Sequence, residues 1–246
     1  MTRRSARRAI GLLLSLLVIA AAVLVFMEPD GPGLIDSTIG GRTSYTVDER
    51  IEQYASAVEH RRRPDVERAG LRWPVRELAY VAFKDARRLE VYGREAGGAW
   101  RFVRAYPMLA ASGRPGPKLR EGDRQVPEGI YRAAVLNPNS RFHLSIGLDY
   151  PNALDRSVAA SEGRTQLGGD IMIHGNSVSI GCLAMGDEAA EDLFIMAAIA
   201  GRENLRIIVA PTDFRVAPVA SVRESRAWVR ALYHSLDSAL REYPLQ

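Results

Sequence analysis

The sequence contains a single cysteine, Cys182, which excludes a disulfide bond within the chain. A lone cysteine is either a buried packing residue or a reactive thiol. The surrounding residues favour a reactive thiol, because His174 lies eight residues upstream in the run IHG and Cys182 itself closes the run SIGC. The thiolate is the nucleophilic form of cysteine, and a nearby imidazole can take the thiol proton or stabilise the anion. Residues 168–194 are therefore the candidate catalytic segment.

Several other chemical signatures are missing. The sequence has no P-loop, no glycine fingerprint of the dinucleotide-binding folds and no internal repeat. No second histidine or carboxylate is spaced to complete a metal site with His174. His143 falls in an alternating strand pattern and His234 in a terminal helical pattern, so we expect a structural and a surface histidine. We therefore expect neither a metal nor a cofactor.

The excess of basic over acidic residues is small. The formal net charge is +4 at pH 7 and the pI is about 9.4. No aromatic-basic repeat or helix motif of a nucleic-acid reader is visible, which argues against a nucleic-acid partner. An anionic cell-wall polymer or a membrane surface is the better electrostatic match.

The N-terminus has the pattern of a membrane anchor. The run MTRRSARR places four arginines ahead of residues 10–27, which carry no charge. Arginines on this side keep the N-terminus in the cytoplasm and place the rest of the chain outside. The apolar run is just long enough to span a bilayer, and it ends in bulky residues where a cleaved signal has small ones. We expect residues 1–27 to form an uncleaved transmembrane helix, with a cleaved signal as the alternative.

Residues 28–75 are predicted to be a linker with one short helix. Glycine and proline are frequent in 28–42, which is typical of a flexible spacer. Apolar residues recur near helical spacing over 47–60. We expect this helix to end at the arginine run 61–63 and Pro64. These arginines are expected to form a solvated charged turn, and the alternative is contact with the wall or with phospholipid.

Residues 76–215 are rich in strand patterns and are predicted to form the catalytic domain. Two apolar runs, 78–83 and 89–92, flank a polar turn and predict a hairpin. Further strands are expected at 100–106, 130–136, 142–148 and 205–210. Because these runs dominate the domain, the fold class is mixed α/β (α+β) and predominantly β.

Two helices complete the expected fold. Gly186 and the acidic residues after it start a buried helix that ends at Gly201, directly after the turn that holds the candidate nucleophile. The C-terminal segment 216–246 is expected to form a helix, because residues 225–243 show helical periodicity. Packing on the domain is the favoured role for that helix, and binding a partner is the alternative.

The motif around the thiol resembles a known family. The run IHG, then S-x-G-C, then an apolar residue and Met, is similar to the YkuD-type L,D-transpeptidase catalytic domain, whose signature is His, a spacer and [ST]-H-G-C. The short spacer and the run SIGCLAM resemble the YafK-like branch. The run PEGIY at 127–131 is similar to a recurrent Pro-x-Gly-x-Tyr of the family. The resemblance implies a β-sandwich or barrel domain with a helix after the nucleophile turn.

The resemblance assigns roles to individual residues. Cys182 corresponds to the acylated nucleophile and His174 to the general base. Gly175 stands where a backbone carbonyl orients the imidazole. The N–H groups of Gly181 and Cys182 stand where the family stabilises the oxyanion. Ser179 matches the [ST] position and is a candidate on the substrate side.

The sequence also departs from the family pattern. Ile180 stands where most members carry a second histidine, and Ala184 stands where many carry Arg or Asn. Both positions lose a polar group near the substrate, so the substrate or acceptor is open to differ. Tyr150 and Asn152 belong to a run similar to the YPNxxD loop of YafK-like members. Their polar groups either meet substrate or form Asx turns.

The family implies acyl transfer on peptidoglycan stem peptides outside the cytoplasmic membrane. The expected partners are stem peptides, a wall-linked lipoprotein as a further acceptor, and the inner membrane through residues 1–27. An L,D-transpeptidase uses a stem peptide, a D-amino acid or a protein lysine as acceptor. The alternatives are an L,D-hydrolase or amidase that uses water, and a wall-binding module with an inert thiol.

Overall fold

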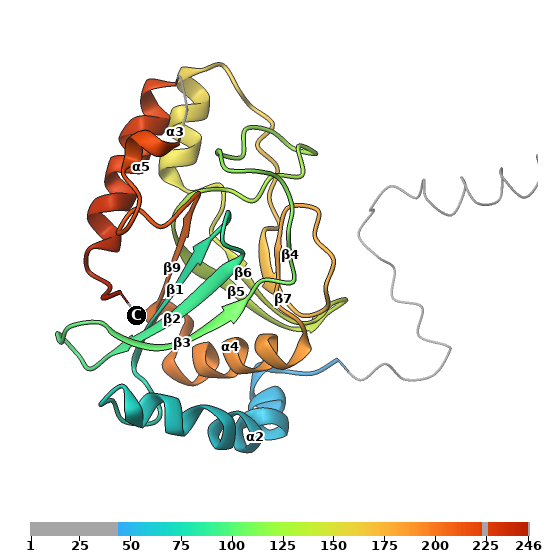
Figure 1. The fold of residues 1–246 in the computed structure, drawn as a ribbon. Coiled ribbons are helices and arrows are strands. Elements are labelled where there is room, and N and C mark those ends of the chain that lie inside the picture. The colour runs from blue at the N-terminus through green and yellow to red at the C-terminus, as the bar shows by residue number, and fades with distance from the viewer. Residues whose placement is uncertain (1–43, 223–225, 246) are drawn as a thin grey trace, which may run out of the picture. The chain divides into compact units, whose positions relative to one another are not determined.

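The structure is a computed structural model, and it describes residues 44–222 and 226–245 (Figure 1). The expected membrane anchor at 1–27 and the glycine-rich spacer at 28–42 lie outside these residues. Within the described ranges, no helix is both long and apolar enough to cross a membrane. The described chain begins just ahead of helix α2 (Val47–Arg68). The side chain of Thr46 caps the N-terminus of this helix.

A sheet of nine strands forms the centre of the described chain. The strands lie in the order β3-β2-β1-β9-β5-β6-β7-β8-β4. Their bounds are β1 (Glu77–Phe83), β2 (Arg88–Arg94), β3 (Arg101–Pro107), β4 (Ala110–Ala111), β5 (Gly129–Ser140), β6 (His143–Leu148), β7 (Met172–His174), β8 (Leu183–Ala184) and β9 (Leu205–Ala210). β1 pairs antiparallel with β2, as the predicted hairpin requires, and parallel with β9. The prediction of a predominantly β domain is confirmed.

The sheet bends along β5. Residues 129–132 of this strand pair with β9, whereas residues 133–140 pair with β6. The register of the β5–β6 pair shifts between Ala133 and Val135 and again between Asn137 and Ser140. Such irregularities bend a strand and increase its twist. The described sheet is therefore an open half-barrel with β3 and β4 at its edges, where the sequence had predicted a sandwich or barrel.

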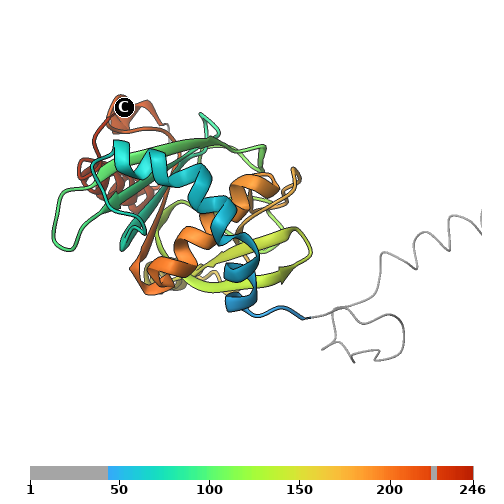
Figure 2. The ribbon, with the colours of Figure 1, turned by 90° about the horizontal axis from the view of Figure 1, so that it is seen from below.

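Helices cover both faces of the β1–β9 part of the sheet (Figure 1). Alternate residues of a strand point to opposite faces. Leu78 and Tyr80 of β1 join a core cluster that includes α4 (Asp187–Ala200), whereas Ala79 and Val81 join a cluster with α5 (Ala227–Leu240). Figure 2 shows α2 crossing α4 on the outside. The C-terminal helix thus packs on the domain, as predicted.

The predicted end of the first helix is wrong. α2 continues to Arg68 with Pro64 inside it, and the arginine run is not a solvated turn. The Arg61 Nε donates to Asp192 Oδ1 of α4 at 3.0 Å, and the Arg62 Nε lies 3.3 Å from Asp192 Oδ2. Since Asp192 is fully buried, these ion pairs fix α2 on α4. They stabilise a helical turn that a proline would otherwise weaken.

Candidate active site

His174 is the last residue of β7, a short strand between β6 and β8. It lies opposite Ser145 in the antiparallel pair with β6 and opposite Ala184 in the parallel pair with β8. The residue is 3% exposed, and its ring stacks on Phe142 with the centroids 4.8 Å apart. Nδ1 lies 2.6 Å from the carbonyl oxygen of Gly175. The imidazole is therefore fixed by packing on one face and by a hydrogen bond at one nitrogen.

The contact with Gly175 selects one tautomer of His174. A carbonyl oxygen can only accept a hydrogen bond, so Nδ1 carries the proton and Nε2 keeps a lone pair. Burial lowers the pKa of His174 below its ordinary value of 6.5, and the hydrogen bond to Gly175 opposes this in part. The imidazole is neutral at pH 7, so Nε2 can accept a proton. This is the orienting contact that the family resemblance assigns to Gly175.

Gly175 is held where a side chain has no room. A Cβ at this position would lie 2.5 Å from Asp187 Oδ1 and 2.8 Å from the Phe142 carbonyl oxygen. The Gly175 N–H donates to that same carbonyl at 3.0 Å. Asp187, the first residue of α4, also accepts the N–H of Asn176 at 2.7 Å. The start of α4 and the turn before β6 therefore clamp the chain that follows His174.

Cys182 lies directly before β8 and is partly buried. Its Sγ accepts the Met172 N–H at 3.4 Å and donates to the Asp170 carbonyl oxygen at 3.5 Å. Burial raises the pKa of the Cys182 thiol above its ordinary value of 9.0, and the Met172 N–H opposes this in part. A sulfur that donates to a carbonyl carries its proton. Both observations describe a neutral thiol at rest.

The fold places His174 at the end of β7 and Cys182 directly before the neighbouring strand β8, without a hydrogen bond between their side chains in the described chain. Ala184 is the residue opposite His174 in the β7–β8 pair, and Cys182 comes two residues before Ala184. Two residues of extended chain correspond to an offset of roughly 6–7 Å along the strand direction. No hydrogen bond joins the thiol to the imidazole in the part of the chain that the structure describes. Proton transfer between them needs rotation of the Cys182 side chain or a bridging group.

The Ser179 hydroxyl organises the turn before the thiol. Its oxygen accepts the N–H of Cys182 at 3.1 Å and the N–H groups of Gly181 and Ser112, each at 3.3 Å. It donates in return to the Cys182 carbonyl oxygen at 2.6 Å. Gly181 has a φ of +139°, which a side chain rarely adopts. Ser179 therefore lies inside the turn and occupies the two N–H donors that the resemblance assigns to the oxyanion.

Tyr150 and Asn152 also use their polar groups inside the fold. The Tyr150 hydroxyl donates to a backbone carbonyl at 3.3 Å, and its ring is buried. Asn152 caps α3 (Ala153–Ser161), because its side-chain oxygen accepts the N–H groups of Leu154 and Asp155. This helix was not predicted from the sequence. The contacts of Asn152 are those of an Asx turn, which is one of the two interpretations that the sequence left open.

A loop at 112–126 borders the nucleophile turn, and the sequence showed it only as a loop. The Ser112 hydroxyl lies 3.2 Å from the Ser179 hydroxyl. A Cβ on Gly181 would lie 3.8 Å from the carbonyl oxygen of Gln125. The loop therefore forms one side of the site. Its glycines, prolines and charges have no periodicity, so only long-range pairing reveals its place.

A buried ion pair fixes this loop. Lys84 Nζ lies 3.0 Å from Glu128 Oε1 and donates to the carbonyl oxygens of Gly116 and Val126, both at 2.8 Å. Glu128 accepts the Gly116 N–H at 2.7 Å and the hydroxyl of Tyr233 on α5 at 2.8 Å. Lys84, which belongs to the polar turn of the predicted hairpin, thus ties the loop to the sheet and to the C-terminal helix.

The two departures from the family pattern differ in their surroundings. Ile180 is 79% exposed and Val178 is 54% exposed, so the turn presents apolar side chains to solvent beside Cys182. Ala184 is fully buried opposite His174. A longer polar side chain at Ala184 has no space without rearrangement. Neither Ile180 nor Ala184 therefore supplies the polar group that many family members carry at its position.

The described residues also locate the other histidines that the sequence singled out. The His143 Nε2 lies 2.9 Å from Glu191 Oε1 of α4, and its ring meets the edge of Tyr54. His234 is exposed on α5. Within the described ranges, no group of three or more His, Cys, Asp or Glu side chains is placed to hold a metal ion.

Comparison with known proteins gives a family match over the sheet. The family model of the YkuD L,D-transpeptidase catalytic domain matches residues 79–209, which is more than half of the 246 residues. YafK of Escherichia coli K12, provisionally named an L,D-transpeptidase, is 34% identical over 134 residues. The match covers 52% of this chain and 52% of that protein. The chain thus spans about half the length of the curated relatives it matches.

Solved structures resemble the chain more distantly. The helical cell shape determining protein Pgp2 of Campylobacter jejuni has a TM-score of 0.45 and 23% identity, over 65% of this chain and 54% of that one. L,D-transpeptidase 1 of Mycobacterium tuberculosis has a TM-score of 0.32 and 18% identity, over 55% and 62% of the two chains.

Proposed function

Because the chain belongs to the YkuD family of L,D-transpeptidase catalytic domains, we propose that it performs cysteine-dependent acyl transfer on peptidoglycan stem peptides. The observation that supports this proposal is the arrangement of a neutral imidazole at the end of β7 and a lone thiol directly before the adjacent strand β8, both inside the matched residues. Cys182 serves as nucleophile and His174 as general base.

The first half of the reaction forms a thioester. Nε2 of His174 takes the thiol proton as Sγ of Cys182 attacks a stem-peptide carbonyl, and the carbonyl oxygen becomes an oxyanion. The imidazolium then gives its proton to the leaving amine as the carbon–nitrogen bond breaks. Because both groups are neutral at rest, the proton moves as the sulfur–carbon bond forms, rather than before substrate binds.

The second half releases the acyl group. An acceptor amine loses a proton to His174 and attacks the thioester carbonyl, and the carbon–sulfur bond breaks. The thiolate takes the proton back from the imidazolium, which restores the neutral pair. Atoms and charges balance with no cofactor.

The oxyanion needs donors that Ser179 holds at rest. The N–H groups of Gly181 and Cys182 both bond to the Ser179 hydroxyl. A substrate oxygen that replaces or shares this acceptor gains two donors, and one such donor is worth about 2.7–4 kcal/mol in comparable sites. We propose that substrate binding turns the sulfur toward Nε2 and the substrate oxygen toward these N–H groups.

The acceptor is a separate question. The exposed Ile180 offers no hydrogen bond to hold an acceptor amine, which favours water as a second candidate acceptor. In that case the same thioester is hydrolysed, and the protein is an L,D-hydrolase or an amidase that releases wall-linked protein. The cell envelope, outside the inner membrane, is the proposed location for either reaction.

Product analysis separates these functions. Purified protein is incubated with monomeric and dimeric muropeptides, and the products are identified by mass spectrometry. New dimers support transpeptidation, whereas loss of dimers or shortened stems supports hydrolysis. Cys182→Ala is the control and is expected to give neither. Unchanged muropeptides with no covalent adduct on the wild type would leave a wall-binding module and overturn the enzymatic proposal.

A further inference from the structure

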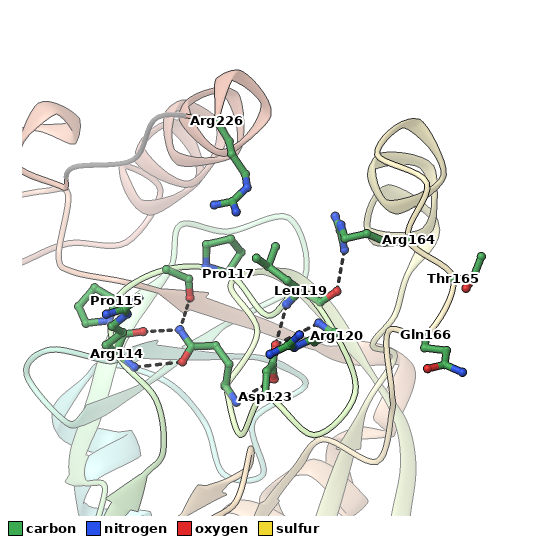
Figure 3. Close-up of a pocket in the computed structure, with 12 residues that line it drawn as sticks. Arg114, Pro115, Pro117, Leu119, Arg120, Asp123, Arg164, Thr165, Gln166 and Arg226 are labelled. Carbon is green, nitrogen blue, oxygen red and sulfur yellow. Dashed lines mark hydrogen bonds between the residues drawn. The ribbon is translucent and has the colours of Figure 1, made fainter.

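A groove of about 690 Å³ lies beside the candidate active site (Figure 3). Residues from two segments, 114–125 and 164–166, line it together with Arg226 at the start of α5. The first segment ends at Gln125, whose carbonyl oxygen faces Gly181. The second continues along the chain to Asp170, whose carbonyl oxygen accepts the thiol of Cys182. Both walls of the groove therefore lead to the nucleophile turn.

Arginines dominate the lining of this groove. Arg114, Arg120, Arg164 and Arg226 line it, and Asp123 is the one carboxylate among the lining residues. Figure 3 shows Arg226 reaching from α5 toward the groove and Arg164 pointing toward it from the opposite segment. A concave surface lined by charges of one sign concentrates the potential and attracts ligands of the other sign.

The carboxylate of Asp123 does not neutralise these arginines. Its oxygens accept from Lys118 Nζ at 2.6 Å and from the N–H groups of Leu119, Arg120 and Gln125 at 2.8 to 3.1 Å. Burial raises the pKa of Asp123, but the hydrogen bonds from Lys118 and from the backbone lower it further, so the net shift is downward. Asp123 is thus ionised and is used by its own loop.

The arginines differ in how far they are already paired. Arg164 lies 2.7 Å from Glu162 and also donates to the Leu119 carbonyl at 2.9 Å. Arg114 and Arg120 are exposed, and within the described residues their guanidinium groups make no hydrogen bond or ion pair. These two groups therefore have donors available for a ligand.

We propose that the arginine groove binds carboxylates of the stem peptide whose carbonyl is presented to Cys182. This inference rests on the proposed function, since it assigns a subsite to the same substrate. A stem peptide carries free carboxylates on its acidic and diamino-acid residues and at its end. A guanidinium matches a carboxylate with two parallel N–H donors. The groove has the volume of a typical small-ligand site, so it holds a few residues of a peptide.

A binding experiment that needs no turnover tests this assignment. The full chain carrying Cys182→Ala is titrated with a stem tetrapeptide by calorimetry, alone and combined with Arg114→Gln and Arg120→Gln. We expect the double arginine change to raise the dissociation constant about tenfold or more, because two charge-assisted contacts to the peptide are lost. Arg76→Gln is the matched control, because Arg76 is also exposed and lies away from the groove. An unchanged dissociation constant in the double variant, with its thermal unfolding also unchanged, would overturn the proposal.

Two further titrations identify the chemistry of the ligand. The same peptide with its carboxylates converted to carboxamides is expected to bind the Cys182→Ala protein about tenfold more weakly than the free acid does. The double arginine variant is expected to bind the carboxamide peptide no more weakly than it binds the free acid. Inorganic phosphate is used as a competitor. Acetate is the control competitor. If phosphate displaces the peptide at a lower concentration than acetate does, and only when Arg114 and Arg120 are intact, the groove is assigned to a phosphate ligand. This result would overturn the carboxylate assignment. Arginine-dependent binding without wild-type turnover would reject the enzymatic function and keep the subsite.

Discussion

His174 is the last residue of β7 and Cys182 directly precedes the parallel neighbour β8, and in the described chain each of them bonds to backbone rather than to the other. The imidazole Nδ1 meets the Gly175 carbonyl at 2.6 Å, and the thiol meets the Asp170 carbonyl at 3.5 Å. Burial lowers the pKa of His174 and raises the pKa of Cys182. The two shifts both disfavour an imidazolium–thiolate pair before substrate binds.

The pH dependence of activity follows from these shifts. Because the base must be neutral, kcat/KM is expected to fall at acid pH only when His174 becomes protonated, with a midpoint below the ordinary value of 6.5. The pKa of the Cys182 thiol lies above the ordinary value of 9.0, so we expect the alkaline limb of the rate profile to have its midpoint above pH 9.0. A rate profile with a stem-peptide substrate measures both limbs. An acid midpoint above 6.5 would contradict the lowered pKa of His174, and an alkaline midpoint below 9.0 would indicate a preformed ion pair.

Ser179→Ala is expected to reduce both activity and stability. The change removes the acceptor for three N–H groups at the nucleophile turn. Leaving partly buried donors without partners costs about 1–3 kcal/mol. Thermal unfolding and kcat are measured beside Ser177→Ala, because Ser177 is exposed and its hydroxyl reaches Asn176 at 3.5 Å. Wild-type kcat in the Ser179 variant would show that the hydroxyl does not hold the turn.

Gly175→Ala is expected to disrupt the site through a steric clash. The added Cβ would lie 2.5 Å from Asp187 Oδ1 and 2.8 Å from a backbone oxygen, so the chain beside the base must move. We expect destabilisation of about 1–3 kcal/mol and loss of most activity. Gly169→Ala is the matched control, since nothing lies within 4 Å of its Cβ. Equal unfolding midpoints in the two variants would contradict this account.

Asp192→Ala is expected to release α2 from the domain. Asp192 is fully buried and accepts from Arg61 and from the Tyr106 hydroxyl, at 2.9 to 3.0 Å. Removing one partner of a buried ion pair costs about 3–5 kcal/mol, because the other charge stays buried. Denaturant unfolding measures the loss against Glu67→Ala, an exposed residue on α2. A change below about 1 kcal/mol would show that the pair is replaceable.

The sequence predicted the elements whose signals are local. The hairpin of β1 and β2, the strand β9 and the helix α4 all have apolar runs bounded by turn residues, and each was found where expected. The motif around Cys182 predicted that the thiol and the imidazole of His174 work together, and this role stays a prediction. The signals of the hairpin, β9 and α4 are local, and tertiary contacts did not override them here.

The missed features depend on partners far along the chain. The arginine run predicts a helix end followed by a solvated turn, but its counter-charge, Asp192, lies 131 residues beyond Arg61 in the sequence. Lys84 does lie in the predicted turn of the hairpin, but its burial was not predicted, because its partner Glu128 is far along the chain. α3 was missed because nine residues give too short a period to outweigh the Asx signal of Asn152.

The most direct test of the catalytic claim is intact-protein mass spectrometry during turnover of a stem tetrapeptide. We predict a transient mass increase equal to the acyl portion of the peptide, mapped to Cys182 by digestion and released by hydroxylamine as a thioester is. The increase is absent from Cys182→Ala. Turnover that persists in Cys182→Ala, or an adduct on any other residue, would contradict the mechanism.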